Sequence, residues 1–233
     1  MIIYIKNYKG GVGKSTITKN LASGLEKSNL KTAIVTFDAQ NDSLAMFGHD
    51  WEASNGFKHF VKTNNDCSIH IRPNIHYYPL ETDVFGANLK SKIKKAFEYL
   101  RTTYQVILID GAPAVDGVLD SVALEISNKI IVPIMLDKSS VNGLARFLET
   151  EAGQKVNLIA PNFYGGTKVN KAYYKALEDF TKDSSVTLLN PIKRTALEEE
   201  LSEKGKTIFE TEDKRSFETR DRYIEMIEVI FND

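Results

Sequence analysis

Short apolar runs alternate along the chain with stretches in which apolar residues recur every three or four positions. The runs show no strict alternation of apolar and polar residues, a pattern typical of strands buried on both faces of a parallel sheet. They comprise Ile2–Ile5, Ala33–Phe37, Val106–Ile109, Ile130–Ile134 and Val156–Ile159. We therefore predict that these segments are strands of one sheet.

The intervening stretches have helical spacing. Ile17, Leu21 and Leu25 share one face of the first stretch, and a lysine-rich stretch between Leu89 and Leu100 repeats the pattern. Further helices are predicted near Asp116–Ser127, Ser140–Ala152, Lys168–Thr181, Thr195–Glu203 and Lys214–Phe231.

The alternation of strands and helices predicts a doubly wound, mostly parallel α/β sheet with helices on both faces and ligands at the carboxyl ends of the strands. The 233 residues are enough for a sizeable core, and we expect a single domain over residues 1–233. Gly48–Pro73 is the least periodic part, and we expect an irregular excursion there. Because the first predicted strand starts at Ile2, we expect neither a signal peptide nor an upstream domain.

Composition narrows the possible classes of protein. Hydrophobic residues make up 42% and charged residues 26% of the chain, as in ordinary globular proteins, and no apolar run is long enough to span a bilayer. With a formal net charge of −1, any contact with DNA requires a local basic patch. The single cysteine, Cys67, excludes an internal disulfide and a cysteine-held metal cluster, and we expect a reducing cytoplasm.

The segment Lys9–Thr16, Lys-Gly-Gly-Val-Gly-Lys-Ser-Thr, stands between the first strand and the first helix. Glycines here let backbone N–H groups converge on phosphate oxygens, and the positive end of the following helix favours the same anion. Lys14 is placed to contact the β- and γ-phosphates, and the Ser15 hydroxyl to bind Mg²⁺. A plain glycine turn would not explain the two lysines, so the segment predicts a nucleotide phosphate site.

The usual phosphate loop, G-x-x-x-x-G-K-[ST], would need a glycine where this chain has Tyr8. The motif K-G-G-x-G-K-S found instead resembles the deviant Walker A box of the ParA/MinD ATPase family. The resemblance implies a P-loop fold and Mg²⁺-dependent hydrolysis of ATP to ADP and phosphate. It implies that the nucleotide is held by Lys9, Gly10, Gly11, Val12, Gly13, Lys14, Ser15 and Thr16.

Two carboxylates extend the resemblance. Asp38 follows the second predicted strand and matches the second aspartate of the family's D-x-D-P-Q box, although Thr36 and Ala39 replace the first aspartate and the proline. In the family this residue organises the attacking water and the Mg²⁺ shell; the alternative is that Asp38 caps a turn. Asp110 ends the apolar run from Val106 and matches the family's Walker B aspartate, near the metal.

Later segments are also similar to the family. Val132-Pro133-Ile134, with Ser140 and Gly143-Leu144, is similar to its v-P…s…G-l stretch. Asn162 lies in a segment similar to the family's base-proximal region, where it would read an adenine edge or close a turn after the strand. Pro191 lies in a segment similar to the family's t-x-I-P-R region, which implies a place near the base.

Lys9 has the most specific implication. Lys14 belongs to nearly every phosphate loop, whereas the family lysine that matches Lys9 reaches across an ATP-bound dimer to the partner's phosphates. There it would neutralise charge in the transition state of phosphoryl transfer. The alternative is an exposed loop lysine. The resemblance thus implies an ATP-dependent homodimer with Lys9, Lys14 and Asp38 as catalytic residues.

The resemblance leaves several cellular roles open. A small ParA-type protein would bind DNA nonspecifically as an ATP dimer, be cytoplasmic and nucleoid-associated, and segregate a plasmid or chromosome. A ParB-like centromere-binding adaptor would stimulate its hydrolysis. A MinD-like protein would bind membrane through a C-terminal helix, but the polar face of residues 223–233 is acidic, so we expect no membrane contact. An ATPase that positions a cargo other than DNA is the other alternative.

Two sets of basic residues are candidates for the DNA-binding surface. One candidate set is Lys193, Arg194, Lys204, Lys206, Lys214, Arg215, Arg220 and Arg222. A second set is Lys90, Lys92, Lys94 and Lys95. Acidic residues, notably Glu198–Glu200, are interleaved with the first set, so a solvated surface of mixed charge is the alternative for both.

Overall fold

The computed structural model describes residues 1–51, 55–81, 86–113 and 117–232. These residues form a sheet with the strand order β3-β4-β2-β5-β1-β6-β7-β8, in which β3 and β4 pair antiparallel and the other neighbours pair parallel. The strands are β1 (Ile2–Ile5), β2 (Thr32–Thr36), β3 (Ile69–Arg72), β4 (Ile75–Tyr78), β5 (Val106–Asp110), β6 (Lys129–Met135), β7 (Leu158–Asn162) and β8 (Thr187–Leu188).

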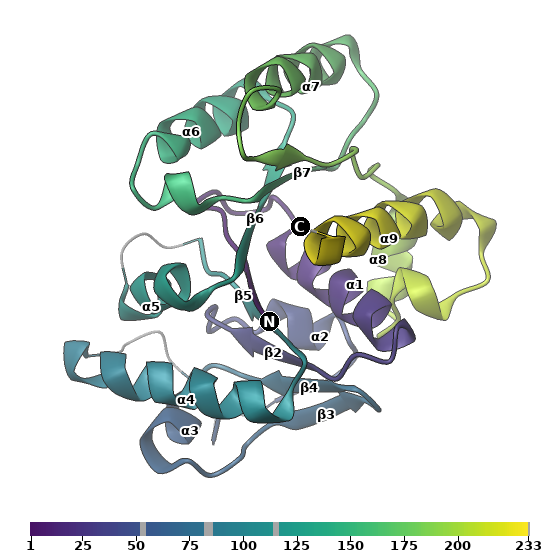
Figure 1. Ribbon diagram of the computed structural model, residues 1–233. Helices are drawn as coiled ribbons and strands as arrows, with labels where there is room; N and C mark the ends of the chain where they lie inside the picture. The colour runs from purple at the N-terminus through teal and green to yellow at the C-terminus, as the bar shows by residue number, and fades with distance from the viewer. Residues whose placement is uncertain (52–54, 82–85, 114–116, 233) are drawn as a thin grey trace.

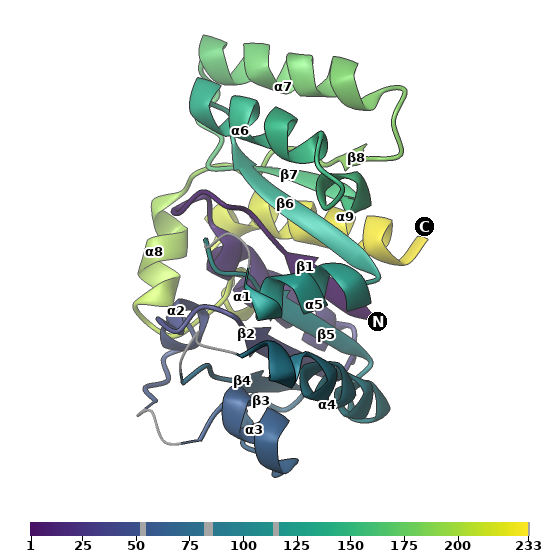
Figure 2. The ribbon, with the colours of Figure 1, turned by 90° about the vertical axis from the view of Figure 1, so that its left-hand side faces the viewer.

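Helices cover both faces of the sheet (Figure 1). The α-helices are α1 (Lys14–Lys27), α2 (Asp42–Ala45), α3 (Phe57–Thr63), α4 (Lys90–Thr103), α5 (Val118–Ile126), α6 (Lys138–Leu148), α7 (Lys168–Thr181), α8 (Ala196–Ser202) and α9 (Phe217–Asn232). Figure 2 shows the same stack from the side, with α7 at one end and α3 at the other. Helices α3 to α7 contribute to one apolar core, and α1, α2, α8 and α9 contribute to the other.

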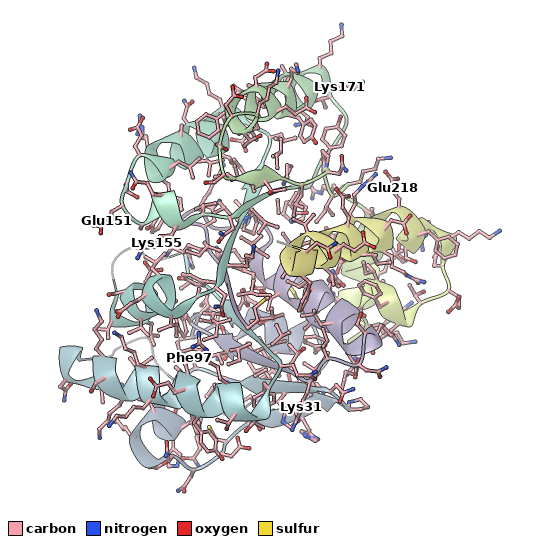
Figure 3. The ribbon with its side chains drawn as sticks, viewed as in Figure 1. Lys31, Phe97, Glu151, Lys155, Lys171 and Glu218 are labelled. Atoms are coloured by element: carbon pink, nitrogen blue, oxygen red, sulfur yellow. The ribbon has the colours of Figure 1, made fainter. Side chains whose placement is uncertain are left out.

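Strand β1 shows why the sheet needs helices on both faces. Ile3 and Ile5 belong to the core under α1, whereas Ile2 and Tyr4 belong to the core on the opposite face. All four are at most 1% exposed, so neither face of the strand reaches water. On the outer side of this second core, Phe97 of α4 packs toward the sheet at 1% exposure (Figure 3). The doubly wound α/β fold predicted from the apolar runs is therefore confirmed.

The predicted irregular excursion over Gly48–Pro73 is wrong in part. Helix α3 lies within it, and the antiparallel edge strand β3 ends in it at Arg72. Phe57 and Phe60 of α3 are fully buried against the core around α4, which gives the helix a tertiary reason to form despite its short length. The predicted helix start at Asp116 lies outside the described residues, and α5 is described from Val118.

Two glycines pack back to back and join the segment after α2 to the segment after α8. Gly48 and Gly205 have φ angles of 77° and 62°, which other residues rarely adopt. A Cβ at Gly205 would lie 2.8 Å from the carbonyl oxygen of Phe47 and 2.9 Å from the Cα of Gly48. The contact therefore requires glycine for its backbone angle and for its space.

We expect Gly205→Ala to lower the free energy of unfolding by about 1–3 kcal/mol, because it combines backbone strain with overpacking. Gly166→Ala is the matched control, since Gly166 has a φ of 69° but a Cβ at this position would meet no atom of the described residues within 4 Å. Urea unfolding of both variants measures the difference. Equal destabilisation of the two variants would contradict the packing argument.

Candidate nucleotide-binding and hydrolysis site

The carboxyl ends of β1, β2 and β5 meet at one point of the sheet. Asp110, the last residue of β5, pairs in register with Ile5 of β1 and with Thr36 of β2. Its backbone oxygen accepts a hydrogen bond from the Phe37 N–H at 2.8 Å, and the next residue, Gly111, donates to Ile5 at 3.0 Å. The register of the sheet thus brings the phosphate loop, Asp38 and Asp110 to the same edge.

The phosphate loop turns into α1 through two glycines in the left-handed region. Gly11 has a φ of 71° and Gly13, the residue before α1, a φ of 89°. A Cβ on Gly13 would lie 2.1 Å from the Asn162 side-chain nitrogen, which itself donates to the Val12 carbonyl at 3.0 Å. Asn162 therefore supports the loop from β7, and only glycine fits beside it.

Lys14 lies across the loop at the start of α1. It is 7% exposed, and its Nζ donates to the Lys9 carbonyl at 3.2 Å. Burial lowers the pKa of Lys14, while the charges of Asp110 and Asp38 act in the opposite direction. The ammonium is thus a poorly hydrated cation beside two carboxylates, which favours its binding to an incoming phosphate.

Asp110 is surrounded by hydroxyl groups. The Ser43 Oγ donates to one carboxylate oxygen at 2.7 Å, and the Thr18 Oγ1 lies 3.3 Å from the other. Burial raises the pKa of Asp110 to about 6, against hydrogen bonds from Ser43, Ser15 and Thr18 and the charge of Lys14. A buried carboxylate with a raised pKa is a common feature of functional sites.

The donor set at Asp110 fits a magnesium ion. Hydroxyl and carboxylate oxygens are the hard ligands that Mg²⁺ prefers, and it usually takes only one or two carboxylates in addition to phosphates and waters. No cluster of three or more His, Cys, Asp or Glu side chains that could hold a metal occurs in the described part of the chain. Ser15 and Asp110 could hold Mg²⁺ here, and a cation there would offset the cost of the buried carboxylate.

Asp38 lies just after β2, on the opposite side of Asp110 from the phosphate loop. Its Oδ1 accepts the Gln40 N–H at 3.0 Å, so the turn-capping role is present in the structure. Asp38 also lines a cavity of about 400 Å³ together with Lys6, Ala112 and Pro113. The second carboxylate oxygen has no hydrogen bond among the described residues, so capping leaves Asp38 with acceptor capacity for a water molecule.

Lys9 is bound to helix α6. Its ammonium lies 2.8 Å from the Ser140 Oγ and 3.3 Å from Asp137 Oδ2, and both residues belong to the start of that helix. Asp137 also caps α6 by accepting the Ser140 N–H at 2.9 Å. Partial burial acts to raise the pKa of the Asp137 carboxyl. The hydrogen bonds from Ser140 and the contact with Lys9 outweigh this effect and lower the pKa. The Lys9 side chain is thus held by an ion pair within its own chain.

A second cleft, of about 320 Å³, borders the start of α1. It is lined by Thr16, Met46, Asn162, Phe163, Ile192, Lys193, Arg194, Thr195, Glu198, Glu199, Ser202, Glu203, Thr219 and Tyr223. The Asn162 oxygen accepts the Phe163 N–H at 2.9 Å and its nitrogen binds Val12, which favours the turn-closing alternative for this residue. Pro191 precedes the lining residue Ile192. Base contacts by Asn162 and Pro191 stay predictions.

Sequence patterns did not single out Thr18, Ser43 or Asp137. Each acts across a long sequence separation: Thr18 and Ser43 bind Asp110, and Asp137 binds Lys9. A signal was present for Thr18, which stands one helical turn after Lys14, and for Asp137, which has the sequence signature of a helix N-cap. Ser43 carried no such signal, because its partner is set by how β2 and β5 pair.

The parallel sheet, the glycine turn into α1 and the carboxylates at the strand ends define a P-loop nucleotide-binding fold. A family model described as an AAA domain matches residues 1–158. Together with the partition ATPases among its relatives, this match shows that the chain belongs to the ParA/MinD family of P-loop ATPases.

One relative is the chromosome-partitioning ATPase Soj of Treponema pallidum, which is 28% identical over 157 residues. The match spans 62% of this chain and 60% of that protein, less than two thirds of its length. Two solved structures resemble the whole fold. Apo McdA of Cyanothece has a TM-score of 0.80 at 16% identity and covers 98% of both chains. A plasmid partition protein of Borrelia burgdorferi bound to AMPPNP has a TM-score of 0.77 at 21% identity and covers 97% of both.

The raised pKa of Asp110 makes a prediction for stability. The pKa of the Asp110 carboxyl rises from 3.8 to about 6 on folding, so the folded state binds the carboxyl proton more tightly than the unfolded state does. Burial of the charged carboxylate therefore destabilises the fold, and this cost reaches its full size above about pH 6. We expect Asp110→Asn to raise the free energy of unfolding in Mg²⁺-free buffer by about 3 kcal/mol at pH 7.5 and by only about 1 kcal/mol at pH 4.5.

Urea unfolding at the two pH values measures this gain. Asp183→Asn, a change at an exposed carboxylate after α7, is the control and should show no gain at pH 7.5. A decrease in the stability of Asp110→Asn at pH 7.5 would mean that the carboxylate stabilises the apo fold, contrary to the burial argument.

Proposed function

We propose that this chain is a partition-type ATPase that dimerises when it binds ATP and Mg²⁺ and uses hydrolysis to return to the monomer. Family membership and the nucleotide analogue bound to the Borrelia relative support nucleotide binding. The observation that carries the proposal is Lys9, a second lysine in a loop that already contains Lys14. A loop built only to hold phosphate needs one such cation.

The proposed chemistry assigns a separate task to each residue. The N–H groups of Gly10 to Ser15 and the ammonium of Lys14 bind the phosphates. Mg²⁺, when bound beside Ser15 and Asp110, would neutralise charge on the phosphate oxygens. Asp38 accepts a hydrogen bond from a water molecule and orients it toward the γ-phosphate. These groups surround the phosphates from one side and leave the opposite side for a second subunit.

The proposed role of Lys9 requires it to change partners. In the single chain its ammonium is held by Asp137 and Ser140, at a side-chain exposure of 39% for both Lys9 and Asp137. A half-exposed ion pair of this kind contributes little to stability, so it can open at low cost. An incoming polyphosphate of a partner subunit would offer Lys9 a stronger electrostatic partner. Asp137 then acts as the intramolecular competitor for Lys9, and ATP-driven dimerisation as the event that releases it.

We expect Lys9→Ala to keep nucleotide affinity within about threefold and to lower kcat by about 100-fold or more, because the charge supplied in trans is absent. Asp137→Asn is the matched variant, because it keeps the α6 cap but weakens the competitor. It should shift the ATP-dependent dimerisation midpoint to lower protein concentration. Phosphate release and light scattering measure the two effects. A Lys9→Ala protein that hydrolyses ATP at the wild-type rate would exclude the proposed role.

The proposed DNA surface is narrower than the sequence suggested. Lys193 pairs with Glu218 at 2.8 Å (Glu218 is labelled in Figure 3), and Arg222 pairs with Glu225 at 3.1 Å. Arg215 pairs with acidic residues, and Arg220 donates to backbone carbonyls. Exposed basic residues of this set without an ion pair in the described part of the chain are Arg194, Lys204, Lys206 and Lys214. We propose that these four contribute most of the DNA contacts.

The second set is also partly neutralised. Lys90 and Lys94 of α4 both pair with Glu125 of α5, whereas Lys92 and Lys95 are exposed without an ion pair among the described residues. A single helix with two available lysines offers few phosphate contacts. The C-terminal set is therefore the better candidate for nonspecific DNA binding. In a dimer the sets of the two subunits together would offer more phosphate contacts.

The membrane alternative has less support. No helix in the described ranges is long and apolar enough to cross a bilayer. Tyr223, Met226 and Ile230 of α9 are buried against the domain, whereas Ile224 and Phe231 are 41% and 43% exposed. Their neighbours on the exposed face, such as Glu228, are acidic, which disfavours anionic lipid.

Lys204→Ala/Lys206→Ala should weaken ATP-dependent binding to random-sequence DNA and lower the slope of log K against log salt by about 0.9 for each phosphate that is no longer neutralised. Arg215→Ala/Arg222→Ala removes the same number of positive charges from residues that are already paired, and it should change both quantities less. Fluorescence anisotropy over a salt series measures them. Equal effects of the two double variants would mean that net charge, and not this surface, controls DNA binding. Wild-type binding by Lys204→Ala/Lys206→Ala would mean that the DNA binds to another surface.

A further inference from the structure

A third lysine lies beside the phosphate loop and is buried. Lys6 is the first residue after β1 and is 1% exposed. Its Nζ lies 2.6 Å from Oδ1 of Asp120, in the first turn of α5, and 4.2 Å from the centre of the Tyr8 ring. The Tyr4 hydroxyl donates to the same Asp120 oxygen. Tyr4, Lys6, Tyr8 and Asp120 are called the Lys6 cluster below.

Stability alone does not explain why these charged residues are buried together. Removing a lysine and an aspartate from water costs more free energy than burying an apolar pair of similar size, so a buried ion pair is weak evidence for stabilisation. Burial and the Asp120 charge raise the pKa of Tyr4, so the phenol stays a donor to Asp120. Tyr4 and Lys6 both donate to the same Asp120 oxygen, so the cluster connects the start of α5 to β1 through two contacts.

The cluster attaches the start of α5 to β1 and to the residue directly after β1. Tyr4 of β1 and Lys6 both bind Asp120 in the first turn of α5. A second attachment lies at the end of β5, where Gly111 donates a hydrogen bond to Ile5 and a Cβ on Gly111 would lie 2.6 Å from the Ile5 oxygen. The residue after Asp110 and the start of α5 are thus each attached to the strand that leads into the phosphate loop.

The cluster also extends toward Asp38. Lys6 and Asp38 line the same cavity of about 400 Å³. The Tyr4 ring centre lies 6.2 Å from that of Phe37, the residue before Asp38. After burial, the charge of Lys6 also contributes to lowering the pKa of Lys14, so its field reaches the phosphate lysine. A displacement of Lys6 would therefore change the surroundings of both Asp38 and Lys14.

We propose that Lys6 is a positioning residue for ATP hydrolysis. By binding Asp120 it holds the start of α5 at a fixed place relative to the phosphate loop and Asp38. It affects the rate of the chemical step more than nucleotide affinity, because its ammonium is engaged by Asp120. The inference rests on the ATPase activity proposed above and adds a residue outside the phosphate-binding motif.

The test removes both charges together in the full-length chain, as Lys6→Met/Asp120→Asn. This variant leaves no unpaired buried charge in the pair and keeps an oxygen at position 120 for Tyr4. We expect kcat to fall about tenfold while the Kd of a fluorescent ATP analogue stays within about threefold of wild type. Wild-type kcat in the folded variant overturns the proposal, because the pair would then have a structural role alone.

Tyr4→Phe keeps the ion pair and the ring and removes only the hydroxyl donated to Asp120. Tyr4→Phe should lower kcat about threefold and leave Kd unchanged. If the double variant does not fold, Tyr4→Phe is the test, and an unchanged kcat overturns the proposal. Arg72→Met/Glu210→Gln is the control, since it removes an ion pair of the same 2.6 Å length that lies between β3 and the Ile208–Glu210 turn. It should lower the urea midpoint and leave kcat unchanged. Absence of hydrolysis in the wild-type chain would instead overturn the proposed function.

Discussion

The Asp110 carboxylate is buried where β1, β2 and β5 end, and the rest of the site is arranged around it. Parallel register places it between Ile5 and Thr36, and hydroxyls from α1 and α2 supply its hydrogen bonds. Even so, burial raises its pKa to about 6, so the charged form is disfavoured in the isolated chain. A bound cation would lower the cost of this buried charge, which connects the packing of the sheet with the proposed binding of Mg²⁺ and nucleotide.

Three lysines in or next to the phosphate loop differ in the groups that hold them. Lys14 is buried across its own loop and has only a backbone carbonyl as hydrogen-bond partner among the described residues. Lys6 is fully buried and fixed by Asp120. Lys9 is half exposed and held by Asp137 in a pair that can open. Differences in burial therefore suggest different functions: binding for Lys14, positioning for Lys6 and exchange between partners for Lys9.

Sequence patterns predicted those parts of the molecule that local chemistry determines. Apolar runs are sufficient for buried parallel strands, and the glycines around Val12 are sufficient for a phosphate loop. The patterns failed where an element depends on tertiary contacts, as in α3, which forms because Phe57 and Phe60 are buried against α4. They also overestimated the basic surface, because Lys193 and Arg215 find acidic partners only after folding. The partners of Asp110 and Lys9 likewise depend on strand order, which a single sequence does not show.

Dimerisation by ATP is the central claim, because Lys9 has a catalytic role only if a second subunit is present. Sedimentation equilibrium of the wild-type chain, with Mg²⁺ and a slowly hydrolysed ATP analogue or with ADP, tests it most directly. If ATP drives dimerisation, the measured mass is twice the chain mass of 26.2 kDa with the analogue and the monomer mass with ADP. A monomer in both conditions, at protein concentrations where the analogue is bound, would contradict it.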